Sequence, residues 1–167
     1  MPRALGPRHL LLLLALGALA LTGCGAATER GAEAFYREHG AEAAQTAQAA
    51  RALGAEVAGL PARPSTSRLE ALAVAEHRTR RDLLAAAKWT VVEDGEEEGV
   101  SQATKEINEG TGALLQAMTE IRLYASTLRP GYLADYRTEL ARGREYWNQG
   151  ITQLWYVAHK SSPPKIQ

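Results

Sequence analysis

The chain has 167 residues, with 19 basic and 19 acidic side chains, 46% hydrophobic residues and a single cysteine. This balanced charge gives no reason to expect nucleic acid as a partner, because domains that bind nucleic acid normally carry a basic surplus. One cysteine allows no disulfide within the chain, no thiolate metal centre and no covalently attached c-type haem.

Residues 1–23 have the pattern of a cleavable export signal. Arg3 and Arg8 form a positive start, an apolar run follows over Leu10–Leu21, and small residues come after it. A permanent membrane-spanning helix needs about 20 apolar residues, so this run is too short for one. It is typical of a signal peptide, which directs export and is then removed. The 144 residues that remain would be enough for one domain.

The signal ends in Leu21-Thr22-Gly23-Cys24, and Cys24 is the only cysteine of the chain. These four residues resemble the lipobox of bacterial lipoproteins, and the resemblance is confined to this segment. It implies that a diacylglyceryl group is attached to the Cys24 thiol and that a dedicated peptidase cuts between Gly23 and Cys24. The fatty acyl chains, such as palmitate, would bind a membrane, because each buried methylene contributes about 0.8 kcal/mol. An ordinary secretory signal with an incidental cysteine is the alternative.

We expect the protein on the extracytoplasmic face of a cell membrane, anchored through Cys24. The residue after the cysteine is Gly25 and not aspartate, which resembles the outer-membrane sorting class where an organism has two membranes. Residues 24–31 would form the lipidated cysteine and a short tether. Fully extended at about 3.5 Å per residue, this tether spans less than about 30 Å, so the folded domain would sit close to the bilayer.

Residues 32–160 are predicted to form a four-helix bundle, beginning with two helices whose small or apolar residues recur three and four apart. This spacing places them on one face of a helix. The first helix runs from about Ala32 to Leu60, and the prolines that follow end it. The second opens at Ser67, which would form a capping box with Glu70, and its pattern fades in the acidic segment 93–99. The expected core positions are Tyr36, His39, Ala43, Thr46, Ala50, Leu53, Val57 and Leu60, then Leu69, Leu72, Glu76, Thr79, Leu83, Ala86 and Thr90.

The third helix has the most regular pattern, and Pro130-Gly131 ends it. The fourth runs from about Leu133 to Val157, and residues 161–167 are predicted to be a non-helical tail. Short connections and the absence of strand patterns predict an all-α fold, an antiparallel up-down four-helix bundle. The expected core positions are Val100, Thr104, Ile107, Thr111, Leu114, Met118, Ile121, Ala125 and Leu128, then Leu133, Tyr136, Leu140, Gly143, Trp147, Gly150, Leu154 and Val157.

Glycines and other small residues interrupt these core patterns and leave two questions open. The glycines at positions 110, 112, 143 and 150 either allow close helix packing or cost up to about 1 kcal/mol each.

Matching the helices layer by layer places Glu76 level with Leu114 and Trp147, beside a layer of small residues. Such a layer could leave a pocket for a small ligand. Its residues would be Glu76, Thr79, Thr111, Trp147 and Gly150. The alternative is a pattern shifted by one position, with Glu76 reaching water.

Five aromatic residues are expected at the end of the bundle that the anchor would hold near the membrane. Tryptophan and tyrosine favour the bilayer interface, but in a bundle they also cap the core, and the sequence allows both. The residues are Phe35, Tyr36, Trp89, Trp155 and Tyr156.

The sequence shows no pattern for catalysis. It contains no Glu-x-x-His, no glycine-rich phosphate loop and no nucleophile elbow, so we expect no metal site, no cofactor and no enzyme activity. The expected function is a non-catalytic interaction or accessory module of the cell envelope, with the membrane and an envelope protein as partners. A small-ligand-binding or sensing bundle with a pocket near Trp147 is the alternative, and an enzyme is the third option. The sequence does not fix the oligomeric state.

Overall fold

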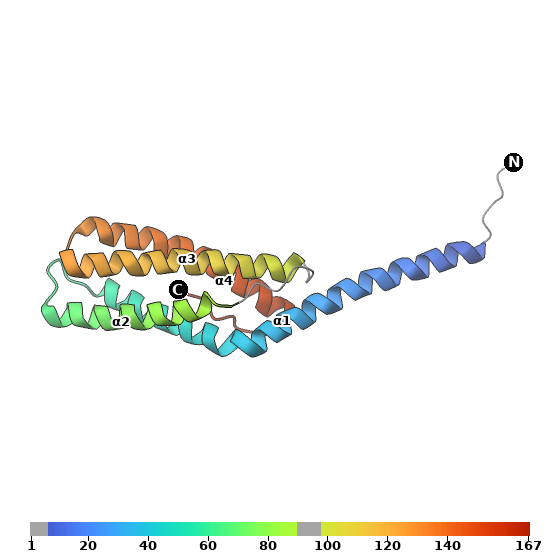
Figure 1. Ribbon diagram of the computed structural model, residues 1–167, viewed down its shortest axis with the longest axis horizontal. Helices are drawn as coiled ribbons and strands as arrows, with labels where there is room; N and C mark the ends of the chain where they lie inside the picture. Colours follow the sequence, from blue (N-terminus) through green and yellow to red (C-terminus); the bar gives the residue numbers. More distant parts are fainter. Residues whose placement is uncertain (1–6, 90–97) are drawn as a thin grey trace.

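Four helices form a bundle in which each helix runs antiparallel to the one before it (Figure 1). The structure, a computed structural model, describes residues 7–89 and 98–167 and places side chains in residues 29–89 and 100–167. The helices are α1 (Pro7–Ala58), α2 (Thr66–Ala86), α3 (Glu98–Thr127) and α4 (Pro130–Val157). The described residues contain no strand, and the prediction of an all-α bundle is confirmed.

The residues assigned to the signal peptide and to the tether lie before the part of α1 that belongs to the bundle. Most of their side chains are outside the described residues, so both assignments stay predictions. The first buried side chain that the structure describes is Ala32, where the sequence placed the start of the bundle. The side chains of the acidic segment 93–99 also lie outside the described residues.

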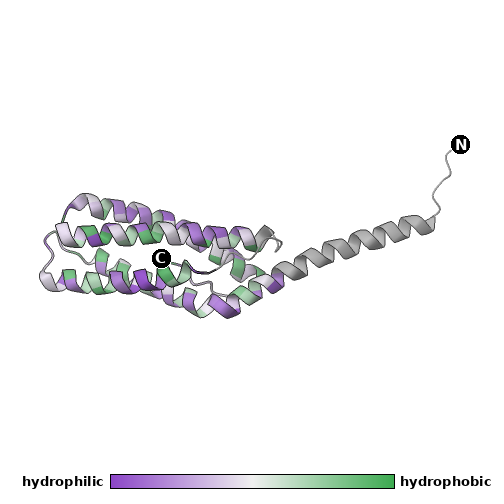
Figure 2. Ribbon diagram, in the orientation of Figure 1, coloured by the Kyte–Doolittle hydropathy of each residue, from purple (hydrophilic) through white to green (hydrophobic). Residues whose placement is uncertain are grey.

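The apolar faces of the helices point toward a common core, as the hydropathy colouring shows (Figure 2). Every predicted core position on the described residues is buried or half-buried except Leu128, and Thr90 lies outside them. Leu128 is 48% exposed, so that prediction was wrong. Its φ of 57° takes it out of the helix. Its N–H bonds to the Tyr124 carbonyl at 2.7 Å, and a left-handed residue with this bond is a common helix end.

Two helix starts differ from the sequence-based expectation. Ser65, and not Ser67, caps α2, because Ser65 has extended backbone angles and its hydroxyl accepts the Arg68 N–H at 3.4 Å. The predicted capping box of Ser67 and Glu70 is therefore wrong. Helix α4 begins at Pro130, whose fixed φ suits the first position of a helix and whose missing N–H is not needed there.

The glycines of α3 and α4 bring the two backbones together. A Cβ placed at Gly110 would lie 2.5 Å from the backbone nitrogen of Trp147, and one at Gly143 would lie 2.6 Å from Cγ of Leu114. A Cβ at Gly150 would collide with the Ala103 carbonyl oxygen. These three glycines therefore serve close packing, whereas Gly112 is exposed and has no neighbouring atom within 4 Å.

The same contacts correct the predicted register of α3 against α4. Leu114 lies opposite Gly143, and Gly110 lies opposite Trp147. The layer-by-layer match had placed Leu114 level with Trp147, which is wrong by about one helical turn. The match counted layers along the helices, whereas the register is set where the glycines of one helix meet the backbone of the other.

The pair Gly110 and Gly112 gives a matched test on one helix. We expect Gly110→Ala to destabilise the fold by about 1–3 kcal/mol, because its methyl group would push α4 away. Gly112→Ala should stabilise it by about 0.5–1 kcal/mol, because alanine loses less backbone entropy in an exposed helix. Denaturant unfolding of both variants measures the difference. Equal effects of the same sign would contradict the close packing of α3 on α4.

Candidate functional site

The predicted lipidation residue Cys24 and the cleavage residue Gly23 precede the first described side chain, so their geometry lies outside the described residues. The other predicted site residues, Glu76, Thr79, Thr111, Trp147 and Gly150, all lie within the described residues.

Trp147 is the centre of this region and is fully buried. Its backbone lies against Gly110 of α3. Its ring lies 5.6 Å from that of Trp89, measured between centroids, and the planes are tilted by 45°. Its indole N–H donates to the Pro164 carbonyl at 3.3 Å. Every side of this residue that could recognise a ligand is therefore in contact with protein atoms.

Thr79 and Glu76 both lie inside the bundle on α2. The Thr79 hydroxyl lies 2.9 Å from the Ala75 carbonyl of its own helix and 3.1 Å from the Ala49 carbonyl of α1. Glu76 is 7% exposed, and its Oε1 lies 3.8 Å from a guanidinium nitrogen of Arg80. Neither of these two atoms has a hydrogen-bond partner. This ion pair is the most polar group among the predicted pocket residues.

Thr111 and Gly150 are the remaining predicted pocket residues, and both are buried. The Thr111 hydroxyl donates to the Ile107 carbonyl at 2.7 Å. Gly150 faces α3, where the Ala103 carbonyl and Ile107 occupy the volume that its missing side chain leaves. At Gly150 the space is thus filled by the approach of α3.

An aromatic cluster covers the core beside Trp147. Phe35 contacts Trp89 edge to face at 5.6 Å, and His39 stacks on Trp89 at 5.1 Å with an interplanar angle of 22°. Tyr36 meets Trp155 edge to face at 5.1 Å, and Lys160 lies over the Tyr36 ring. These rings contact one another within the protein, so they cap the core.

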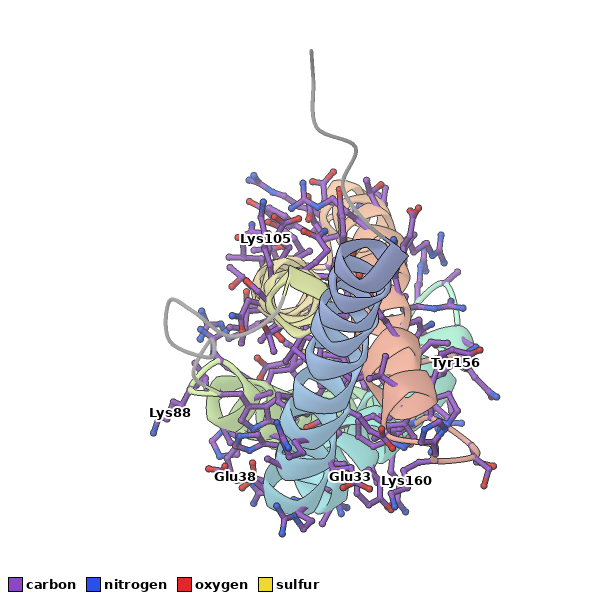
Figure 3. The ribbon with its side chains drawn as sticks, turned by 90° about the vertical axis from the view of Figure 1, so that its right-hand side faces the viewer. Glu33, Glu38, Lys88, Lys105, Tyr156 and Lys160 are labelled. Atoms are coloured by element: carbon purple, nitrogen blue, oxygen red, sulfur yellow. The ribbon has the colours of Figure 1, made fainter. Side chains whose placement is uncertain are left out.

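Tyr156 is the exception among the five predicted aromatic residues, since it is 81% exposed. Figure 3 views this end of the bundle and shows Tyr156 at its periphery, with the charged residues Glu33, Glu38, Lys88 and Lys160 around the same end. Both signs of charge are present. The end of the domain is therefore a mixed charged rim around an aromatic cap.

Sequence reasoning missed the exposed Glu42, which bonds to a buried tryptophan, and the buried Asp82 and Glu106. Glu42 accepts the indole N–H of Trp89 at 2.8 Å, and one carboxylate oxygen of Asp82 accepts from Gln45 of α1 at 3.2 Å. Glu106 is buried on α3 and accepts from Gln102 at 3.0 Å. Asp82 and Glu106 occupy positions beside the apolar stripes, where the spacing rule predicts neither burial nor exposure. No sequence signal identified them.

The described residues contain no group of three or more histidine, cysteine, aspartate or glutamate side chains that could hold a metal ion. Within the same part of the chain, none of the helices combines the length and the apolar character needed to cross a membrane. No protein-family model, curated protein or solved structure matches the chain.

Tyr136 of α4 is almost fully buried, and its hydroxyl has no hydrogen-bond partner. Burial raises the pKa of this phenol from 10.0 to about 12, and the charge of Arg144 partly opposes the shift. The folded state therefore favours the neutral phenol. Its contribution to stability is complete below pH 10 and is lost as the pH rises toward about 12.

We expect Tyr136→Phe to stabilise the fold by about 1 kcal/mol at pH 7, because it removes a buried hydroxyl that has no partner. The difference in the free energy of unfolding between the variant and the unmodified protein should grow by up to about 1.4 kcal/mol per pH unit above pH 10. Denaturant unfolding at pH 7 and at pH 11 measures both effects. Tyr156→Phe at an exposed position is the control and should change neither. A loss of stability with no change in the pH dependence would mean that the hydroxyl has a partner.

Proposed function

We propose that the protein is an exported lipoprotein, anchored through Cys24, whose helical bundle is a non-catalytic interaction module of the cell envelope. The observation that carries this proposal is the position of the lipobox-like sequence Leu21–Cys24. It lies directly before a helical domain whose first described buried residue is Ala32. A lipid on Cys24 would thus leave few residues between the bilayer and the domain.

The end of the bundle near the proposed anchor suits a domain held beside a membrane without inserting into it. Its aromatic residues are mostly in the core, and its rim carries both Lys88 and Lys160 and both Glu33 and Glu38 (Figure 3). A rim of mixed charge has no strong attraction to anionic headgroups. Membrane binding then depends on the acyl chains.

The proposed contact surface for an envelope protein is the outer face of α2. Val74 is 71% exposed and Leu84 is 47% exposed, and both lie on the side of α2 that no other helix covers. The exposed Arg78 lies between them along the helix. Apolar residues with a neighbouring arginine are common in protein interfaces. The predicted pocket residues are engaged by protein atoms, which is why we assign recognition to the outside of the bundle.

Cys24→Ser tests the anchor. The serine hydroxyl does not take the diacylglyceryl group, so the variant should leave the membrane fraction or accumulate with its signal uncleaved. Cell fractionation and mass spectrometry of the N-terminus measure both outcomes. Thr28→Ser, outside the lipobox-like sequence, is the control and should remain anchored. Normal processing and membrane retention of Cys24→Ser would contradict the proposal.

A double variant, Val74→Asp with Leu84→Asp, tests the contact surface. Chemical cross-linking in intact cells should give a specific adduct with the unmodified protein, and the two carboxylates should abolish it by removing apolar contact. The control carries the same added charge on the exposed positions Ala52 and Ala141 of α1 and α4 and should keep the adduct. Circular dichroism checks that both variants are folded. An unchanged adduct in the α2 variant, or no adduct with the unmodified protein, would contradict this part of the proposal.

A further inference from the structure

The C-terminal segment, residues 161–167, turns back from the end of α4 and lies between α4 and α1. The Lys165 carbonyl accepts a hydrogen bond from Arg51 of α1 at 3.0 Å. The Pro164 carbonyl accepts one from the indole of Trp147 at 3.3 Å. Helices α1 and α4 contact each other less than any other pair of neighbours in the bundle. The segment therefore fills the place where direct contact between two helices is weakest.

Asn148 holds the end of this segment by both of its functional groups. Its amide nitrogen donates to the Ile166 carbonyl at 2.9 Å, and its amide oxygen accepts the Ile166 N–H at 2.8 Å. The Ile166 side chain is 1% exposed and belongs to the core cluster. The remaining residues of the segment are half-buried or exposed.

These contacts have the form of peptide recognition. All four hydrogen bonds reach backbone atoms of the segment, and one aliphatic side chain enters the core. Proteins that bind extended peptides obtain affinity from backbone hydrogen bonds and specificity from pockets for individual side chains. We call this site, formed by Arg51, Trp147 and Asn148, the tail groove. The segment that it holds makes a turn, in which the Lys165 N–H bonds to the Pro163 carbonyl at 2.9 Å, and it places an aliphatic residue two positions after a proline.

The connection between α4 and the segment is strained at Ser162, which has a φ of 62° although it is not glycine. His159, with a φ of 51°, ends the helix as Leu128 does, and the N–H groups of His159 and Lys160 bond to the carbonyls of Tyr156 and Trp155 at 3.1 and 2.8 Å. Ser162 precedes Pro163, which further restricts its backbone. Short strained hinges favour the exchange of terminal segments between molecules, because exchange allows the hinge to straighten.

We propose that the tail groove also accepts the C-terminal segment of a second copy of this chain, so that two copies associate by exchanging residues 161–167. The second copy carries the same backbone groups and the same isoleucine, so every contact of the groove can be made again. At low concentration the attached segment has the advantage, because a short connection gives it a high effective concentration. Exchange then grows with protein concentration.

A hinge variant tests the exchange. Deleting Ser161 and Ser162 removes about 7 Å of reach, so that Ile166 no longer returns to its own groove but still reaches a partner's. Light scattering after gel filtration should give twice the mass of the chain for this variant and a monomer for the unmodified protein in dilute solution. Ile166→Asp added to the deletion should restore the monomer. A monomeric or unfolded deletion variant overturns the exchange.

A peptide experiment tests the groove separately. In the full chain with Ile166→Asp the attached segment loses its buried side chain, so a synthetic peptide of residues 161–167 with its native isoleucine should displace it and bind saturably, as measured by tryptophan fluorescence. The same peptide with aspartate in place of Ile166 is the control and should not bind. Adding Asn148→Ala to the protein should weaken binding by at least tenfold. If the Ile166→Asp chain is unfolded, the native peptide should refold it. A native peptide that neither binds nor refolds the chain overturns the peptide site.

Discussion

The close approach of α3 and α4 is the constraint on which the rest of the bundle depends. Three glycines, at positions 110, 143 and 150, leave no room for side chains between the two helices. Their contacts set the register, and the register places Trp147 at the centre of the core. A glycine inside a helix costs up to about 1 kcal/mol relative to alanine, so the packing that it permits has to offset this cost. The exposed Gly112 shows the contrast, because no neighbouring atom compensates for it within 4 Å.

Trp147 connects this helix pair to two other parts of the molecule. Its ring packs on Trp89, which follows the end of α2. Trp89 in turn forms the aromatic cap together with Phe35 and His39. Its N–H bonds to the C-terminal segment, which fills the space between α1 and α4. One residue thus contacts the closest helix pair, the aromatic cap and the tail groove. The tryptophan that the sequence assigned to a ligand pocket is therefore one that holds the fold together.

The sequence predicted the faces of the helices but not how the helices meet. The three-and-four spacing of α3 is a local property of one helix, so burial of Leu114 and Ile121 follows from it. The register between helices depends on which small residues face each other, and one chain offers several ways to pair them. Of the candidate site, the burial of Trp147 was predictable and the direction of its contacts was not. The non-helical tail was predicted, but its packing on the bundle was missed because its single aliphatic residue, Ile166, has no periodic partner to mark it.

The contact surface proposed on α2 and the tail groove are compatible, because they lie on different sides of the bundle. Among the described residues α2 contacts α1 and α3 but not α4, so it is diagonal to the helix that forms most of the groove. Val74 and Leu84, which are exposed in the single chain, are therefore not part of the groove that would hold an exchanged segment. Anchoring at a membrane would also confine the copies to two dimensions and raise their local concentration. At a high local concentration, the segment of another molecule competes with the attached segment for the tail groove. Lipid anchoring, segment exchange and recognition through α2 would then act together, since each uses a separate part of the domain.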